Sequence, residues 1–254
     1  MNKSIAKQIY DFYFILIKGE YLVEKVIGIL GGMGPEATAD LFRRIIRATP
    51  AKKDQDHIRV IIDSNPKIPD RTAAIIGGGS SPLHEMTKTA KNLEKAGADF
   101  IIIPCNTAHY YYEELKKSVG IPILNMVELV AQMIREKFSN VKKVGVISTT
   151  GTVKAGIYDR ALDRNRVEVI YPSKELQDKV MEAIYDNIKA GRIFEGKEII
   201  VKVATRLVEE GAELIICGCT EVSLVLKSGD IPVPVVDPLQ ILAETAVAEA
   251  LRRS

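Results

Sequence analysis

The chain has 254 residues, and 46% of them are hydrophobic, which is enough to bury a core in one large domain or two small ones. Its 35 basic and 33 acidic residues nearly balance, which argues against nucleic acid or an anionic membrane as a partner. The three cysteines fit neither a disulfide framework nor the paired ligands of a zinc site, so we expect reduced thiols in a cytoplasm and no bound metal.

Residues 1–22 are expected to form an N-terminal extension. Residues 10–17 are apolar enough to look like the centre of a signal sequence. The run is short for a membrane span, however, Asp11 and Lys18 interrupt it, and no small-residue cleavage site follows. The extension is therefore interpreted as an appended helix or strand, or as an upstream start that the mature protein does not use.

From residue 26 the pattern alternates between strands and helices. An apolar run at 26–30 leads through a glycine turn to Pro35, which suits the first turn of a helix reaching about residue 47. The other elements expected in the first half are a strand at 60–63, a loop at 64–72, a helix at 83–96, a strand ending at 104–105, a helix to about 118, a strand at 121–124 and a helix to 138.

The second half repeats this plan. The segments GADFIII at 97–103 and GAELIIC at 211–217 each precede a cysteine, and the two copies are 114 residues apart. The elements expected here are a strand and turn at 144–152, a strand at 167–170, helices at 174–190 and 195–210, a strand ending at 217, a strand at 233–237 and a helix from 238 to about 252. A duplicated α/β domain with parallel sheets follows, and ligands bind such sheets outside the carboxyl ends of the strands.

Two cysteines, Cys105 and Cys219, occupy matching places at strand ends in this repeat. A helix N-terminus nearby lowers the pKa of a thiol, so part of it becomes thiolate. A thiolate and a thiol on opposite faces of a carbon can remove one proton and deliver another, which inverts a stereocentre. A single buried cysteine is usually only a small hydrophobic residue, but the matched positions favour a shared site. Cys217, whose counterpart is Ile103, is expected to face the core.

These motifs resemble the aspartate/glutamate racemase superfamily, and most closely its aspartate racemase branch, from residue 26 to the C-terminus. The carriers are GILGGMGP at 28–35, IPDR at 68–71, PCNTAH at 104–109 and GCTE at 218–221. The resemblance implies two pseudo-symmetric flavodoxin-like domains with the active site between them, a homodimer, and racemisation without a cofactor. It also implies that domain 1 comprises 23–125 plus 238–254, and domain 2 comprises 126–237.

By the same resemblance, Cys105 and Cys219 match the catalytic thiols. The residues implied to bind an acidic amino acid are Met33, Arg71, Asn106, Thr107, Thr150, Lys189, Thr220 and Glu221. Asn106, Thr107 and Thr220 match residues that hold the α-groups, with Met33 and Thr150 nearby in the two turns. His109 is expected to cap or pack the helix after Cys105.

Two of these residues, Arg71 and Lys189, resemble the cations that recognise a side-chain carboxylate. An Arg makes a planar, two-pronged contact with the second carboxylate of aspartate. The alternatives are that an Arg in a loop is solvated and that a Lys near a helix end serves the helix dipole. Glu221 stands where glutamate racemases tend to have a His, which favours the aspartate branch.

Several alternatives stay open. Glutamate or a broader substrate set differs from aspartate by about a methylene, which changes binding by only about 1–3 kcal/mol. Hydantoin racemases and malonate decarboxylases share the architecture, although the decarboxylases use a single catalytic cysteine. In a different class, the turn at 31–35 could cradle a phosphate in a nucleotide-binding module without catalysis, but it lacks the Lys-Ser/Thr of a P-loop. Pyridoxal phosphate would need a lysine Schiff base, which two thiols make unnecessary.

Overall fold

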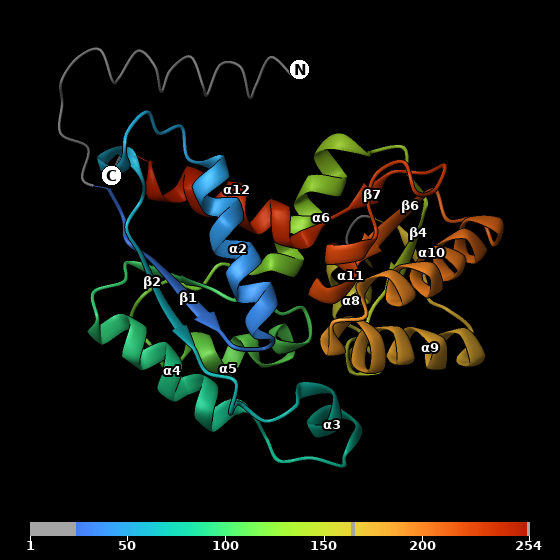
Figure 1. Cartoon of the computed structure of the whole chain (residues 1–254), viewed down its shortest axis with the longest axis horizontal. Helices are drawn as coiled ribbons and strands as arrows, with labels where there is room; N and C mark the ends of the chain where they lie inside the picture. The colour runs from blue at the N-terminus through green and yellow to red at the C-terminus, as the bar shows by residue number, and fades with distance from the viewer. Residues whose placement is uncertain (1–23, 164–165, 253–254) are drawn as a thin grey trace.

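The computed structural model describes residues 24–163 and 166–252 (Figure 1), so the predicted extension at 1–22 lies outside the described residues. The elements of the first half are β1 (Ile27–Gly31), α2 (Pro35–Ala48), the 3-10 helix η1 (Asp54–Asp56), β2 (Val60–Ser64), α3 (Arg71–Ile76), α4 (Leu83–Lys95), β3 (Phe100–Ile102), the 3-10 helix η2 (Thr107–Tyr111), α5 (Tyr112–Lys116) and α6 (Met126–Lys137).

The second half starts at the next strand. Its elements are β4 (Lys143–Ile147), α7 (Thr150–Ala155), α8 (Ile157–Asp163), β5 (Glu168–Ile170), α9 (Lys174–Met181), the π-helix η3 (Glu182–Asn187), the 3-10 helix η4 (Ile188–Ala190), α10 (Ile193–Glu209), β6 (Leu214–Cys217), α11 (Thr220–Val225), β7 (Val235–Val236) and α12 (Pro238–Ala250). None of the described helices is both long and apolar enough to cross a membrane.

The strands form two parallel sheets in which the equivalent strands of the two halves have the same order. The first sheet runs β2-β1-β3 and is extended by a parallel bridge between Ile101 and Ile123, and the second runs β5-β4-β6-β7. β1 and β4 pair with neighbours on both sides, and β1 is buried along its whole length, as a central parallel strand requires. This arrangement confirms the predicted α/β fold with two repeated parallel sheets.

Each sheet is covered partly by the helix that follows the last strand of the other half. α12 packs on α2 and on the apolar residues of β1 and β3, and in Figure 1 it lies beside α2 although it ends the chain. Conversely, α6 packs on β4, β6 and α8 of the second sheet. These contacts support a division in which residues 238–254 join the first domain and residues from 126 join the second. The boundaries themselves stay a prediction.

Some local predictions were wrong. Residues 121–124 form only a bridge at Ile123, where the Ile101 N–H donates to the Pro122 carbonyl and the Leu124 N–H donates to the Ile101 carbonyl. The segment after Cys105 begins as a 3-10 helix, and α7 and α8, which the sequence pattern did not indicate, are separated by Gly156 in the left-handed conformation (φ 57°). The predicted helix at 174–190 changes to π and 3-10 geometry after Met181.

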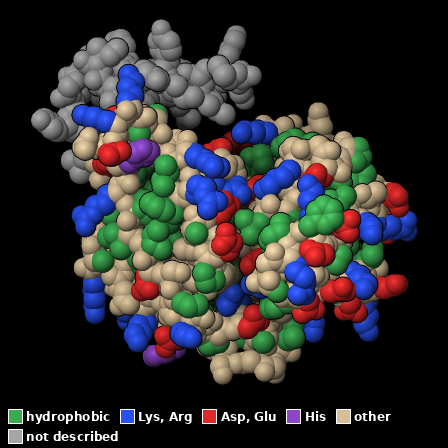
Figure 2. Space-filling view, in the orientation of Figure 1, with side chains coloured by type: hydrophobic (Ala, Val, Ile, Leu, Met, Phe, Trp, Pro, Cys, Tyr) green, Lys and Arg blue, Asp and Glu red, His purple; other side chains and the backbone are tan. Residues whose placement is uncertain are grey.

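Surface charge is mixed. On the face shown in Figure 2, Lys and Arg side chains are interspersed with Asp and Glu over both halves of the molecule. The near balance of 35 basic and 33 acidic residues therefore also holds locally on this face.

Candidate active site

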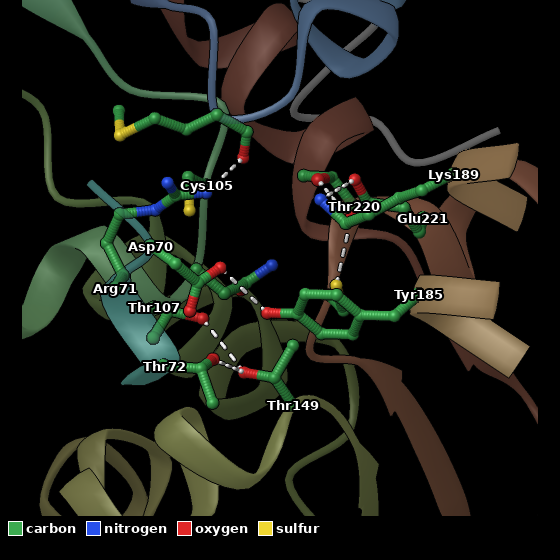
Figure 3. A pocket seen from close by; sticks show the side chains of 13 residues that line it. Asp70, Arg71, Thr72, Cys105, Thr107, Thr149, Tyr185, Lys189, Thr220 and Glu221 are labelled. Atoms are coloured by element: carbon green, nitrogen blue, oxygen red, sulfur yellow. Dashed lines mark hydrogen bonds and ion pairs between the residues drawn. The ribbon is translucent and has the colours of Figure 1, made fainter. Parts of the chain in front are cut away.

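A pocket of about 300 Å³, counting its part open to solvent, lies between the two halves (Figure 3). Its lining residues are Met33, Asp70, Arg71, Thr72, Cys105, Asn106, Thr107, Thr149, Tyr185, Lys189, Cys219, Thr220 and Glu221. Nine of the ten site residues predicted from the sequence are among them, and the exception is Thr150. The structure therefore brings together residues that are far apart in the chain.

The two cysteines enter this pocket from equivalent places. Cys105 lies between β3 and η2, and Cys219 is the residue before α11, after β6. Both are free thiols and both are buried, with exposed fractions of 6% and 7%. Cys217 points elsewhere, into the core of the second half, where it is fully buried as predicted.

Arg71 is buried beside Cys105. It begins α3 instead of lying in a loop as predicted, because Asp70 caps this helix by accepting a hydrogen bond from the Ala73 N–H. The guanidinium donates to the carbonyl oxygens of Met33 (3.2 Å), Pro69 (3.1 Å) and Ile68 (3.4 Å), while its Nε is buried without a partner.

The charge of Arg71 has no close carboxylate partner. Among the described residues no acidic side chain lies within ion-pair distance of it. Burial lowers the pKa of Arg71, but Cys105 and Asp70 outweigh burial, so its pKa is raised and the group stays charged. The pocket thus contains a buried cation that an anionic ligand can pair with.

Around Cys219 the dominant charge is negative. Its Sγ donates to Glu221 Oε2 at 2.9 Å, and Lys189 Nζ lies 3.0 Å from Glu221 Oε1. Burial raises the pKa of Glu221, but Lys189 and Cys219 outweigh burial, so its pKa is lowered and the group is a carboxylate. Burial and this carboxylate raise the pKa of Cys219 well above its ordinary value, with Lys189 opposing them. The expected lowering by a helix N-terminus is wrong for Cys219, because α11 is short and the buried carboxylate is adjacent.

Lys189 is therefore already paired. Burial lowers its pKa, but Glu221 and Cys219 outweigh burial and the pKa is raised. Its Nζ also lies 5.4 Å from the centre of the Tyr185 ring, and the Tyr185 hydroxyl donates to Asp70 Oδ2 at 3.0 Å. Sequence reasoning missed Asp70 and Tyr185 as lining residues. Asp70 belongs to the IPDR motif and could have been chosen, whereas nothing in the sequence around Tyr185 singled it out.

Four buried threonines join the two halves, and three of them, Thr72, Thr107 and Thr149, line the pocket. The hydroxyl of Thr107 is 2.8 Å from that of Thr152 and 3.1 Å from that of Thr149, and the Thr72 hydroxyl donates to Thr149 at 3.1 Å. Thr149 caps α7 by accepting a hydrogen bond from the Thr152 N–H, and it also lines the pocket. Thr150, predicted to contact substrate, instead accepts a hydrogen bond from Gln177 Nε2 at 3.4 Å. The residue chosen from the sequence is thus one position away from the one that lines the pocket, because the sequence does not show which of the two threonines caps α7.

His109 has the structural role that was expected. Its Nε2 accepts from the Met126 N–H at 3.1 Å, so Nδ1 carries the hydrogen and donates to the Cys105 carbonyl at 2.8 Å. Burial lowers the pKa of His109 to about 4, although hydrogen bonds to backbone oppose this. The neutral ring thereby ties the backbone of Cys105 to the start of α6.

Comparisons with known proteins identify the class. A family model described as Asp/Glu/Hydantoin racemase matches residues 30–246, so the chain belongs to this family of isomerases. The solved structure named Picrophilus torridus aspartate racemase superposes with a TM-score of 0.80 and 32% identity, covering 91% of this chain and 96% of that one. An aspartate racemase homologue from Pyrococcus horikoshii OT3 superposes with a TM-score of 0.72 and 27% identity, covering 90% and 100%.

Among curated proteins, the broad specificity amino-acid racemase RacX of Bacillus subtilis (strain 168) is 31% identical, over 89% of this chain and 98% of its own length. The predicted superfamily is confirmed. The names of these relatives differ in the range of substrates they state.

Proposed function

We propose that this protein is an amino-acid racemase that interconverts L- and D-aspartate without a cofactor, using Cys105 and Cys219 as its two bases. One observation carries the proposal: thiols from equivalent positions of the two halves line a single pocket, together with a buried arginine that has no carboxylate partner. A small dicarboxylic amino acid supplies the missing anion and places its Cα between the thiols.

The surroundings of the two thiols suggest how the reaction starts. Arg71 places a positive charge beside Cys105, whereas burial and Glu221 raise the pKa of Cys219 and keep that sulfur protonated. In one direction of the proposed reaction Cys105 is the base that removes the Cα proton of one enantiomer, while the Cys219 thiol delivers its proton to the opposite face. For the other enantiomer the two cysteines exchange roles.

The reverse state needs a thiolate at Cys219, and Lys189 serves that state. Its ammonium, 3.0 Å from Glu221, opposes the rise in the pKa of Cys219 that the carboxylate causes. We therefore assign Glu221 to the control of Cys219, in addition to the substrate contact predicted from its motif. Thr220 supports this placement, since its hydroxyl donates to the same carboxylate oxygen at 3.2 Å.

Aspartate is favoured over a broader substrate set because of Arg71. Burying an arginine without a carboxylate partner is costly unless a ligand supplies an anion, and aspartate brings a side-chain carboxylate in addition to the α-carboxylate that every amino acid carries. A broad specificity remains the second candidate, because RacX of B. subtilis is similar over nearly its whole length. The expected homodimer and cytoplasmic location stay predictions.

The test is a racemisation panel with the purified protein and no added cofactor. We expect L- and D-aspartate to interconvert, with exchange of the Cα hydrogen for deuterium in heavy water. Cys105→Ser and Cys219→Ser should each abolish this, while Cys217→Ser, the matched control in the core, should retain it. Absence of racemisation for every amino acid tried would refute the function, and similar kcat/KM values for many amino acids would replace aspartate by broad specificity.

A further inference from the structure

The side-chain amide of Asn106 is a buried donor that lacks an acceptor. Asn106 lines the pocket, its exposed fraction is 1%, and its Nδ2 has no hydrogen-bond partner. The other end of the amide is occupied, because the Tyr158 hydroxyl donates to Asn106 Oδ1 at 2.5 Å. Buried amide donors are nearly always paired in folded proteins, so an unpaired one in a pocket wall points to a ligand atom.

Tyr158 is held firmly in place. It belongs to α8 and is fully buried in the core of the second half, among the apolar residues of β4, β6 and α6. It does not line the pocket, so it can reach the reaction only through Asn106. Burial raises the pKa of Tyr158 well above its ordinary value, which leaves the hydroxyl protonated and able to donate.

The hydroxyl of Tyr158 decides which way the amide of Asn106 faces. An amide rotated by 180° would turn its NH₂ toward the phenol and its oxygen toward the pocket, where that oxygen would repel a carboxylate. With Oδ1 held by Tyr158, Nδ2 is the end of the amide left without a partner, in a residue that lines the pocket. The contact also crosses between the halves, since Asn106 follows β3 of the first sheet and Tyr158 packs on the second.

We propose that Tyr158 is a positioning residue that fixes the Asn106 amide so that Nδ2 donates to a carboxylate oxygen of the substrate. This rests on the proposed racemase function, which places a carboxylate in the pocket. Negative charge grows on the α-carboxylate oxygens as the Cα proton leaves, so a donor fixed in advance there stabilises the transition state more than the bound substrate. Replacing Tyr158 by Phe should therefore lower kcat more than it raises KM.

A double-mutant cycle tests this coupling. Tyr158→Phe keeps the ring and removes only the hydroxyl, and should lower kcat/KM for aspartate about tenfold. Asn106→Ala should lower it at least as much, and the double variant should be no worse than Asn106→Ala alone. Tyr171→Phe is the matched control, because the Tyr171 hydroxyl donates to Asp159 of α8, the helix that carries Tyr158. Tyr171 does not line the pocket, so its loss should leave activity unchanged.

Binding of succinate, measured by calorimetry on the same four proteins, separates this inference from the proposed function. Succinate carries the carboxylates but cannot racemise, and its affinity should fall in both single variants without a further fall in the double. Additive losses in both assays, or an unchanged Tyr158→Phe, would show that Tyr158 only packs. If the wild type is inactive but binds succinate with the expected coupling, the proposed racemase function is refuted and the inference is kept. If the wild type neither binds succinate nor racemises aspartate, both are refuted.

Discussion

At the scale of single residues, the repeat places two thiols alike but surrounds them differently. Cys105 is followed by Asn-Thr and lies beside Arg71, while Cys219 is followed by Thr-Glu and contacts Glu221. The duplicated backbone is thus nearly symmetric, and the charges at its two cysteines are opposite. The two thiols of the proposed reaction therefore have different electrostatic surroundings.

Glu221→Gln should lower the pKa of the Cys219 thiol. The substitution removes the negative charge 2.9 Å from the sulfur and leaves Lys189 without its counter-ion, and both changes favour the thiolate. In a Cys105→Ser background, the rate of Cys219 alkylation by iodoacetamide, followed by peptide mapping, should rise at a pH lower by about one unit or more.

The control for that measurement is Glu209→Gln, which removes an exposed carboxylate paired with Arg206 and should leave the alkylation profile in place. An alkylation profile that moves to higher pH in Glu221→Gln would contradict the assignment of Glu221 to Cys219.

Arg71→Gln should weaken aspartate binding more than it slows the chemical step. Loss of a charge-assisted contact to a carboxylate costs roughly 1.5–3 kcal/mol, which corresponds to an increase in KM for L-aspartate of about 10-fold or more. Arg71→Lys keeps the charge but not the two-pronged geometry, so its KM for L-aspartate should lie between those of the wild type and Arg71→Gln. Steady-state kinetics decide the matter, with Arg206→Gln, on the surface, as the control. A fall in kcat at constant KM would place Arg71 in the chemical step instead.

At the scale of elements, the pocket depends on how closely α3 meets α7. A Cβ added at Gly151 would lie 2.7 Å from Thr72 Cα, which is closer than side chains tolerate. Gly151→Ala should therefore push α3, and Arg71 with it, away from the second half. Because displacement of a binding group by about 1 Å can cost about 100-fold in rate, we expect kcat/KM to fall by at least tenfold.

Gly78→Ala is the matched control for Gly151→Ala. It lies just beyond the other end of α3, where an added Cβ meets nothing within 4 Å. Thermal unfolding of both variants would show whether the fold survives, and an active Gly151→Ala would mean that α3 is not held by this contact.

The elements that the sequence predicts well are those with long apolar runs. The strands before both cysteines are continuous buried apolar runs, and α2, α4 and α10 have the periodicity of amphipathic helices. Short helices such as α7 and α8 carry too few residues for a period to stand out, and their boundaries are set by caps at Thr149 and Gly156. For this reason Thr149 and Tyr158 were not recognisable from the sequence, while the motif cysteines were. Tyr185 lies where the helix predicted at 174–190 changes to π geometry, which the sequence did not indicate.

At the scale of the whole molecule, the repeat of 114 residues predicts two like sheets but not which helix covers which. α12 is apolar on most sides, with buried residues including Leu239, Leu242 and Ala246, so its own pattern fits several positions. The resemblance assigns this helix to the first domain, and the packing of α12 against α2 supports that assignment. Because α12 packs on both α2 and α6, it links the two halves whose thiols line the pocket.

The stability of the molecule should fall in weak acid through His109. The folded pKa of about 4 is below the usual 6.5, so between these values the unfolded chain binds the proton more readily and the free energy of unfolding decreases as pH falls. The full difference corresponds to about 3 kcal/mol, present above pH 6.5 and lost by about pH 4. Urea unfolding of wild type and His109→Gln across this range should give curves that converge on acidification. His84→Gln, at a side chain 86% exposed, should track the wild type, and a His109→Gln curve parallel to wild type would show that His109 does not stay neutral in the fold.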